Sequence, residues 1–178
     1  PILGTYADVR GSKKKFLTIF ALIGVLGTAL LFFVETGDWL KASIFFIIGN
    51  IGFSGSLVFY DSLLPHVARP EEIDKVSSKG YALGYLGGGI LLAINLVMIM
   101  ATPDNVTALM TRLSFVTVAV WWMVFSIPIL RIVTEPPHKI IPGEDKSNPL
   151  KASFKRLGET FRKLKHYRQL FKFIVAFW

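Results

Sequence analysis

The chain has 178 residues, of which 52% are hydrophobic and only 18% are charged. Its mean hydropathy of +0.52 is above the range usual for soluble domains, so the composition favours an integral membrane protein. The net charge of +8 would support nucleic-acid binding only if the basic residues shared one folded surface, and the absence of cysteine excludes disulfides and thiolate metal sites.

Four segments contain neither a charged residue nor a histidine, and each is long enough to cross a bilayer as an α-helix. They are residues 16–34, 42–60, 81–101 and 113–130. Backbone groups in lipid must pair within their own segment, so we predict four complete transmembrane helices and an all-α integral membrane fold. The apolar run 171–178 predicts the start of a fifth span.

The predicted loops differ strongly in their content of lysine and arginine. These loops are 1–15, 35–41, 61–80, 102–112 and 131–170. The second and fourth contain one basic residue each, Lys41 and Arg112, whereas the other three are rich in them. The positive-inside rule places the first, third and fifth loops in the cytoplasm and the other two outside. Topology thus explains the net charge, and we expect no nucleic-acid partner.

The first loop combines glycines, an acid and several bases in what the sequence predicts to be a tight reversal between two helices. Its candidate functional residues are Gly4, Asp8, Arg10, Gly11, Lys13 and Lys14. Asp8 could cap the helix that follows, or it could complement the dipole of another helix.

Polar residues inside the spans concentrate in the second and third. Asn50, Ser54 and Asp61 are spaced by 4 and 7 residues and therefore share one helical stripe. The third span carries Tyr85 and Asn95. A buried amide without a partner is costly, so both asparagines should face protein or water. They either bond to another helix or line a polar cavity, and we take Asn50, Ser54, Tyr85 and Asn95 as substrate-cavity candidates.

The first and fourth spans look like lipid-facing support, and the fourth carries Trp121 and Trp122. Five glycines lie just before and at the start of the third span, in "KGYALGYLGGG". A dinucleotide fingerprint would need glycine where Leu92 stands, and no P-loop pattern is present, so we expect no cofactor. Three glycines at four-residue spacing predict one face that allows close helix packing. They are Gly80, Gly84 and Gly88.

The long fifth loop begins with turn-like residues and continues with apolar residues at helical spacing among basic ones. The apolar positions are Phe154, Leu157, Phe161, Leu164 and Phe171. This pattern predicts an amphipathic helix on an anionic cytoplasmic leaflet. A helix that binds a partner protein is the alternative.

Gly4-x-x-x-Asp8 followed by Gly11-x-Lys13-Lys14 resembles the loop between the second and third helices of the major facilitator superfamily. The basic residue usual after the acid is Val9 here, with Arg10 one place later. In that superfamily the loop latches the two halves of the transporter together. The resemblance therefore implies a gating role for this loop, with Asp61 as a candidate partner of Arg10.

Two stretches carry a narrower resemblance, "GFSGSLVFYDSLLPHVA" (52–68) and "VSSKGYALGYLGGGILLAINLVMI" (76–99). They resemble the vacuole effluxer-like branch, which includes fungal vacuolar amino-acid effluxers and bacterial relatives. This implies a partial major facilitator fold, with the four spans as the third to sixth of twelve helices. The run 171–178 would start the seventh, and 131–170 would join the two halves. We expect the chain to be part of a longer protein that supplies the other helices.

We therefore expect a secondary active transporter that works by alternating access on a small polar solute. Amino acids as the substrate follow from the resemblance alone. The expected surroundings are the lipid bilayer and the remainder of the same transporter, in a multi-pass position in the cell membrane; the style of the match suggests a bacterial inner membrane. The alternative is a non-transporting membrane scaffold or assembly protein. An enzyme is not expected, because the acids Glu71, Glu72 and Asp74 have no histidine at metal-ligand spacing and fit a helix N-terminus.

Overall fold

The computed structural model describes residues 3–4, 6–7, 11–136, 154–155, 157–160 and 162. The chain forms two compact units: Lys14–Thr134, and a unit made of Pro1–Lys13 with Glu135–Trp178. In the second unit the described residues between 154 and 162 are helical, and they include Phe154 and Leu157 of the expected amphipathic helix. Several predicted features lie outside the described residues. They are Asp8, Arg10, Phe161, Leu164 and the segment 171–178.

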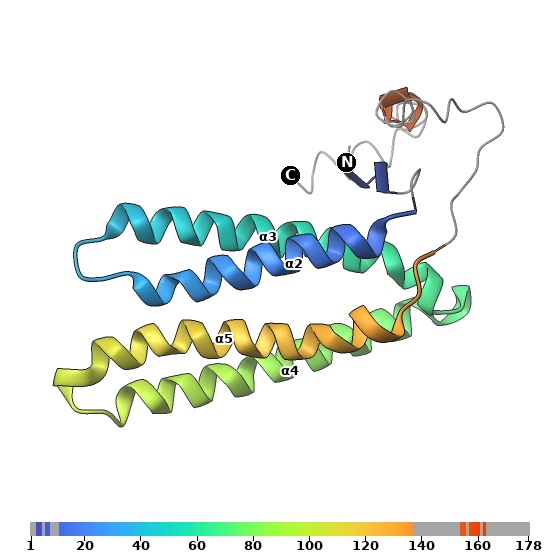
Figure 1. The fold of residues 1–178 in the computed structure, drawn as a ribbon. Coiled ribbons are helices and arrows are strands. Elements are labelled where there is room, and N and C mark those ends of the chain that lie inside the picture. Colours follow the sequence, from blue (N-terminus) through green and yellow to red (C-terminus); the bar gives the residue numbers. More distant parts are fainter. Residues whose placement is uncertain are drawn as a thin grey trace. The chain divides into compact units, whose positions relative to one another are not determined.

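Four long helices make up the first unit (Figure 1). They are α2 (Lys13–Leu30), α3 (Trp39–Val67), α4 (Ile73–Met100) and α5 (Asp104–Ile132). Two one-turn 3-10 helices, η1 (Leu31–Phe33) and η2 (Pro70–Glu72), adjoin α2 and α4. All four long helices have the length and apolar composition to cross a membrane, and the described residues contain no strand. The predicted all-α integral membrane fold is confirmed.

The helices extend beyond the charge-free segments of the sequence. A helix continues as far as its backbone hydrogen bonds do, and this can be outside the hydrocarbon core of the membrane. Between α3 and α4, the loop expected at 61–80 is reduced to a short connection around η2, and α5 already begins at Asp104. Asp61 therefore lies within α3 and not in a loop. Pro65, also inside α3, has no N–H to offer the carbonyl of Asp61, so this carbonyl lacks its usual helical partner.

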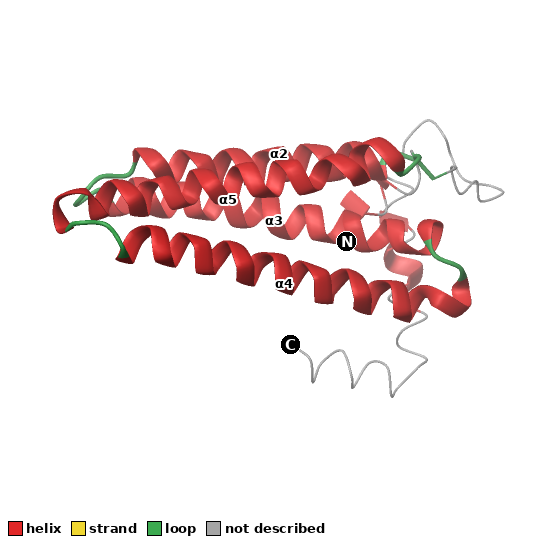
Figure 2. Ribbon diagram, turned by 90° about the horizontal axis from the view of Figure 1, so that it is seen from below, coloured by secondary structure: helices red, strands yellow, loops and turns green. Residues whose placement is uncertain are grey.

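The helices α2 and α3, which a short loop joins into one hairpin (Figures 1 and 2), approach each other so closely that their backbones touch. A Cβ added at Gly52 would overlap the backbone nitrogen of Gly24. One added at Gly27 would lie 2.6 Å from the backbone nitrogen of Gly49. Small residues on both helices thus permit backbone contact, as is typical of packing within membranes. The sequence reading had placed this kind of packing on α4 instead.

The glycine face predicted on α4 has a different environment. A Cβ at Gly80 would lie 3.2 Å from the hydroxyl of Tyr60, while at Gly84 and Gly88 it would meet nothing within 4 Å. Within the described part of the chain these two positions therefore pack against no second helix. Close packing there remains a prediction that concerns other helices of a longer protein.

Two basic side chains join α5 to α2 at opposite ends of the bundle. Lys14 Nζ donates to the carbonyl oxygen of Val133 at 2.7 Å, and Arg112 Nε donates to that of Phe32 at 2.7 Å. The Arg112 guanidinium also lies 5.1 Å from the centre of the Phe32 ring. Carbonyls at helix ends lack intrahelical donors, so each bond satisfies such a group and places a cation at the negative end of a helix dipole.

Candidate functional site

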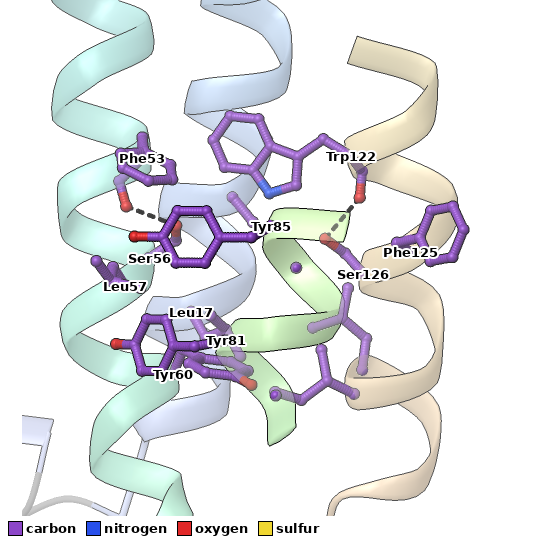
Figure 3. A pocket seen from close by; sticks show the side chains of 15 residues that line it. Leu17, Phe53, Ser56, Leu57, Tyr60, Tyr81, Tyr85, Trp122, Phe125 and Ser126 are labelled. Carbon is purple, nitrogen blue, oxygen red and sulfur yellow. Dashed lines mark hydrogen bonds between the residues drawn. The ribbon is translucent and has the colours of Figure 1, made fainter. Parts of the chain in front are cut away.

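A half-open pocket of about 540 Å³ lies among the four long helices (Figure 3). This volume falls in the range of small-molecule sites. Its apolar lining comes mainly from α2, α3 and α5, namely Leu17, Ala21, Phe53, Leu57, Trp122, Phe125, Ile129 and Leu130. Its polar lining is Ser56, Tyr60, Tyr81, Tyr85 and Ser126, and the glycines Gly80 and Gly84 complete the wall.

Trp122 closes one side of this pocket from α5. Its ring packs directly over Gly24 of α2, where any added Cβ would collide with the indole. The ring also meets Phe53 of α3 edge to face, with 6.0 Å between the centroids. The fourth span, expected to be lipid-facing support, thus also contributes Trp122 to the pocket wall. The glycine on α2 makes room for the indole inside the bundle.

Most of the hydroxyl groups that line the pocket donate their hydrogens to other groups of the protein. Ser56 donates to the carbonyl oxygen of Phe53 and Ser126 donates to that of Trp122, each at 2.8 Å (Figure 3). These donations leave the lone pairs of both serines to face the pocket. A bound molecule therefore meets them as hydrogen-bond acceptors.

A tyrosine–carboxylate pair lies at the α3–α4 side of the pocket. The Tyr81 hydroxyl donates to the Asp61 carboxylate, with distances of 3.2 Å to Oδ1 and 3.4 Å to Oδ2. Figure 3 shows the rings of Tyr81 and Tyr85 reaching from α4 toward α3, and the ring of Tyr60 reaching from α3 toward α4. Three tyrosine rings thus line the pocket between two helices, and one of them, Tyr81, bonds to the Asp61 carboxylate.

The four substrate-cavity candidates are placed differently. Tyr85 lines the pocket. Asn50 and Ser54 are exposed and outside the lining, and the Asn50 side chain donates to the carbonyl of Phe46 in its own helix at 3.0 Å. Asn95 is 7% exposed.

The partner of the buried Asn95 belongs to α5. The hydroxyl of Thr117 donates to its Oδ1 at 2.8 Å, and the same hydroxyl lies 2.7 Å from the carbonyl of Ser114, so one hydrogen is shared. Of the two roles open for Asn95, the structure shows a hydrogen bond between helices. A role on the substrate pathway remains a prediction.

Sequence reasoning missed Ser56, Tyr60, Tyr81 and Ser126 as pocket residues. Tyr60 is the last residue of the charge-free segment 42–60, and Tyr81 is the first residue of the segment 81–101. A tyrosine at such a boundary suggests an anchor at the membrane interface. The four-residue spacing of Tyr81 and Tyr85 was the available signal, since it places both rings on one helix face.

The gating-loop candidates that are described can be placed only in part. Gly11 has a φ of +56°, the left-handed region that glycine adopts readily, which fits a tight reversal before α2. Lys14 bonds to Val133 as above. Searched over the described residues, no three His, Cys, Asp or Glu side chains are grouped so that they could hold a metal ion.

The sequence matches a known protein family along its whole length. Over residues 1–178 the chain matches the family described as "Vacuole effluxer Atg22 like". The chain belongs to this family. The family resemblance read from the motifs of 52–68 and 76–99 is thereby confirmed.

Relatives of this Atg22-like chain are bacterial and fungal. It is 38% identical to "Uncharacterized MFS-type transporter YxiO" of Bacillus subtilis, across 99% of this chain and 41% of that protein. It is 24% identical to "Autophagy-related protein 22-1" of Aspergillus niger, across 96% of this chain and 39% of that protein. The chain thus spans about two fifths of the length of these relatives. No solved structure matches it.

Proposed function

We propose that the whole protein is a secondary active transporter that moves a small polar solute, with amino acids as the substrate class, by alternating access. The observation that carries this proposal is the pocket of about 540 Å³ to which all four spanning helices contribute. Family membership supports it, since the family is described as vacuole effluxer-like and one relative is named as an MFS-type transporter.

Alternating access needs a site between packed helices and connections that can transmit a rearrangement. The pocket offers a mainly apolar wall with hydroxyls contributed by α3, α4 and α5, which suits a solute with both apolar and polar parts. In this proposal the topology read from the basic loops, with residues 1–15, 61–80 and 131–170 in the cytoplasm, is that of a multi-pass membrane protein. The gating role of the loop around Gly4, Asp8 and Arg10 belongs to the same proposal.

The test is counterflow of radiolabelled amino acids into proteoliposomes that contain the full-length protein. Gly84→Leu is the pocket-filling variant, because Gly84 lines the pocket and an added Cβ there meets nothing within 4 Å. Gly89→Leu is its matched control, because Gly89 lies on the same helix with equal room but outside the pocket lining. We expect Gly84→Leu to abolish uptake and Gly89→Leu to leave most of it.

Two results would contradict the proposal. Uptake by the Gly84→Leu variant equal to that of the parent would remove this pocket from the pathway. If the parent takes up none of the amino acids tested, amino acids are excluded as the substrate class. If it takes up no other solute either, the alternative of a non-transporting membrane scaffold is favoured.

A further inference from the structure

We propose that Asp61 with Tyr60, Tyr81 and Tyr85 forms the subsite that binds the ammonium group of the transported solute. This rests on the proposed function and names the part of the solute that the pocket recognises. None of the residues that line the pocket is charged, so the adjoining Asp61 supplies the formal charge at its edge.

The first argument is the hydrogen-bond capacity of the pocket wall. Three of its five hydroxyls, those of Ser56, Tyr81 and Ser126, have their hydrogens in bonds to the protein. They present lone pairs to a ligand. An ammonium group has three donors and no acceptor, which complements this wall, whereas a carboxylate would meet mostly acceptors.

The second argument is the position and state of Asp61. The Tyr81 hydroxyl fixes the carboxylate at 3.2 Å while leaving other lone pairs free. Among the described residues no cation lies within ion-pair distance of this carboxylate. Pro65 also leaves the Asp61 backbone carbonyl without its helical donor, which adds a further acceptor at the same residue.

The third argument is the set of aromatic faces on the pocket wall that the carboxylate adjoins. Tyr60, Tyr81 and Tyr85 are 42%, 43% and 80% exposed, so their rings are not used up in internal packing. Aromatic faces attract ammonium groups through their quadrupole, and they do so more strongly away from bulk water. A carboxylate that is bonded to one of three tyrosines lining the same pocket is therefore a site for a cation that also has an apolar body.

The test measures binding of three probes to the purified full-length protein by titration calorimetry. The probes share one skeleton: L-phenylalanine, 2-phenylethylamine with the ammonium alone, and 3-phenylpropanoate with the carboxylate alone. We expect the first two to bind and the third to fail. Asp61→Asn should weaken binding of both ammonium probes about ten- to hundredfold, the value of one charged hydrogen bond.

Further variants distinguish the effect of the Asp61 charge from that of the Tyr85 ring and from a loss of folding. Asp74→Asn makes the same charge change in the first turn of α4, outside the pocket lining, and should bind as the parent does. Tyr85→Phe keeps the aromatic face and should retain affinity, whereas Tyr85→Leu should lose about threefold or more. A thermal unfolding curve for each variant confirms that it is folded.

The outcomes for the subsite and for transport are distinguishable. The subsite is overturned if neither ammonium probe binds, if 3-phenylpropanoate binds equally well, or if Asp61→Asn binds like Asp74→Asn. Binding that depends on Asp61 without any counterflow would support the subsite and contradict the proposed transport. Counterflow that is the same for Asp61→Asn as for the parent would support the proposed transport and contradict the subsite.

Discussion

The Lys14 ammonium donates a hydrogen bond to the carbonyl oxygen of Val133, 2.7 Å away, and so joins the first turn of α2 to the residue that caps α5. Lys14 was singled out in the sequence for its place in a loop that resembles a gate. Val133 lies at the start of the predicted linker 131–170. The bond therefore connects the start of one helix to the start of that linker.

We predict that Lys14→Met lowers the stability of the full-length protein by about 1 kcal/mol, the lower range for a charged donor at a partly exposed site. Lys15→Met is the matched control, since Lys15 is an exposed lysine one residue away. Thermal unfolding in detergent measures both. Equal shifts for the two variants would show that the loss of charge, and not the bond to Val133, is responsible.

Gly52→Ala should be strongly destabilising, because its Cβ would overlap the backbone of α2 at Gly24 and force the two helices apart. Overpacking of this kind costs about 1–3 kcal/mol. Gly89→Ala adds the same methyl group on α4 where nothing lies within 4 Å, and it should be neutral or stabilising by roughly 0.5–1 kcal/mol. Melting temperatures of the two variants that coincide would exclude the close approach.

Thr117→Val should leave the Asn95 side chain buried without its partner on α5. The expected loss is about 0.6–1.7 kcal/mol, the measured range for hydrogen bonds between membrane helices. Thr111→Val is the control, because that hydroxyl is exposed and bonds only to the carbonyl of Thr107 in its own helix. A double-mutant cycle with Asn95→Ala should give a coupling energy of similar size, and additive effects would contradict the contact.

Asp38, in the short loop before α3, has a pKa below its ordinary value of 3.8, chiefly because the Lys41 side chain donates a hydrogen bond to it and secondly because the Glu35 amide does so. A lowered pKa in the folded state stabilises the protein above the unfolded pKa, and this contribution is lost as the pH falls through the folded pKa. An NMR titration should place the Asp38 midpoint below 3.8 and move it upward in Lys41→Gln. Lys75→Gln should leave the Asp38 midpoint unchanged.

The spans and the fold class were predictable because charge-free runs of membrane length leave the backbone no alternative to a helix. The helix ends were not, since Asp61 and Asp74 are as compatible with a helix as with a loop once outside the hydrocarbon. Composition marks where charge begins, whereas hydrogen bonds decide where α3 and α4 stop.

The packing glycines show a similar limit. The regular spacing of Gly80, Gly84 and Gly88 was visible within one span, but Gly24 and Gly52 belong to different spans. Which of them meet depends on the crossing of two helices, and no local pattern reports it. The pocket residues Tyr81 and Ser126 were missed for the same reason, because a pocket is a relation among four helices.

The backbone contact at Gly24 and Gly52 also bears on how the protein is assembled. Residues 34–38 are all that connect η1 to α3, so the surfaces that meet at Gly24 and Gly52 follow each other closely in the chain. We expect this hairpin to enter the bilayer as a unit, since its contact needs no partner from later in the chain. We expect the pocket wall from α5, including Trp122 over Gly24, to pack onto the hairpin afterwards.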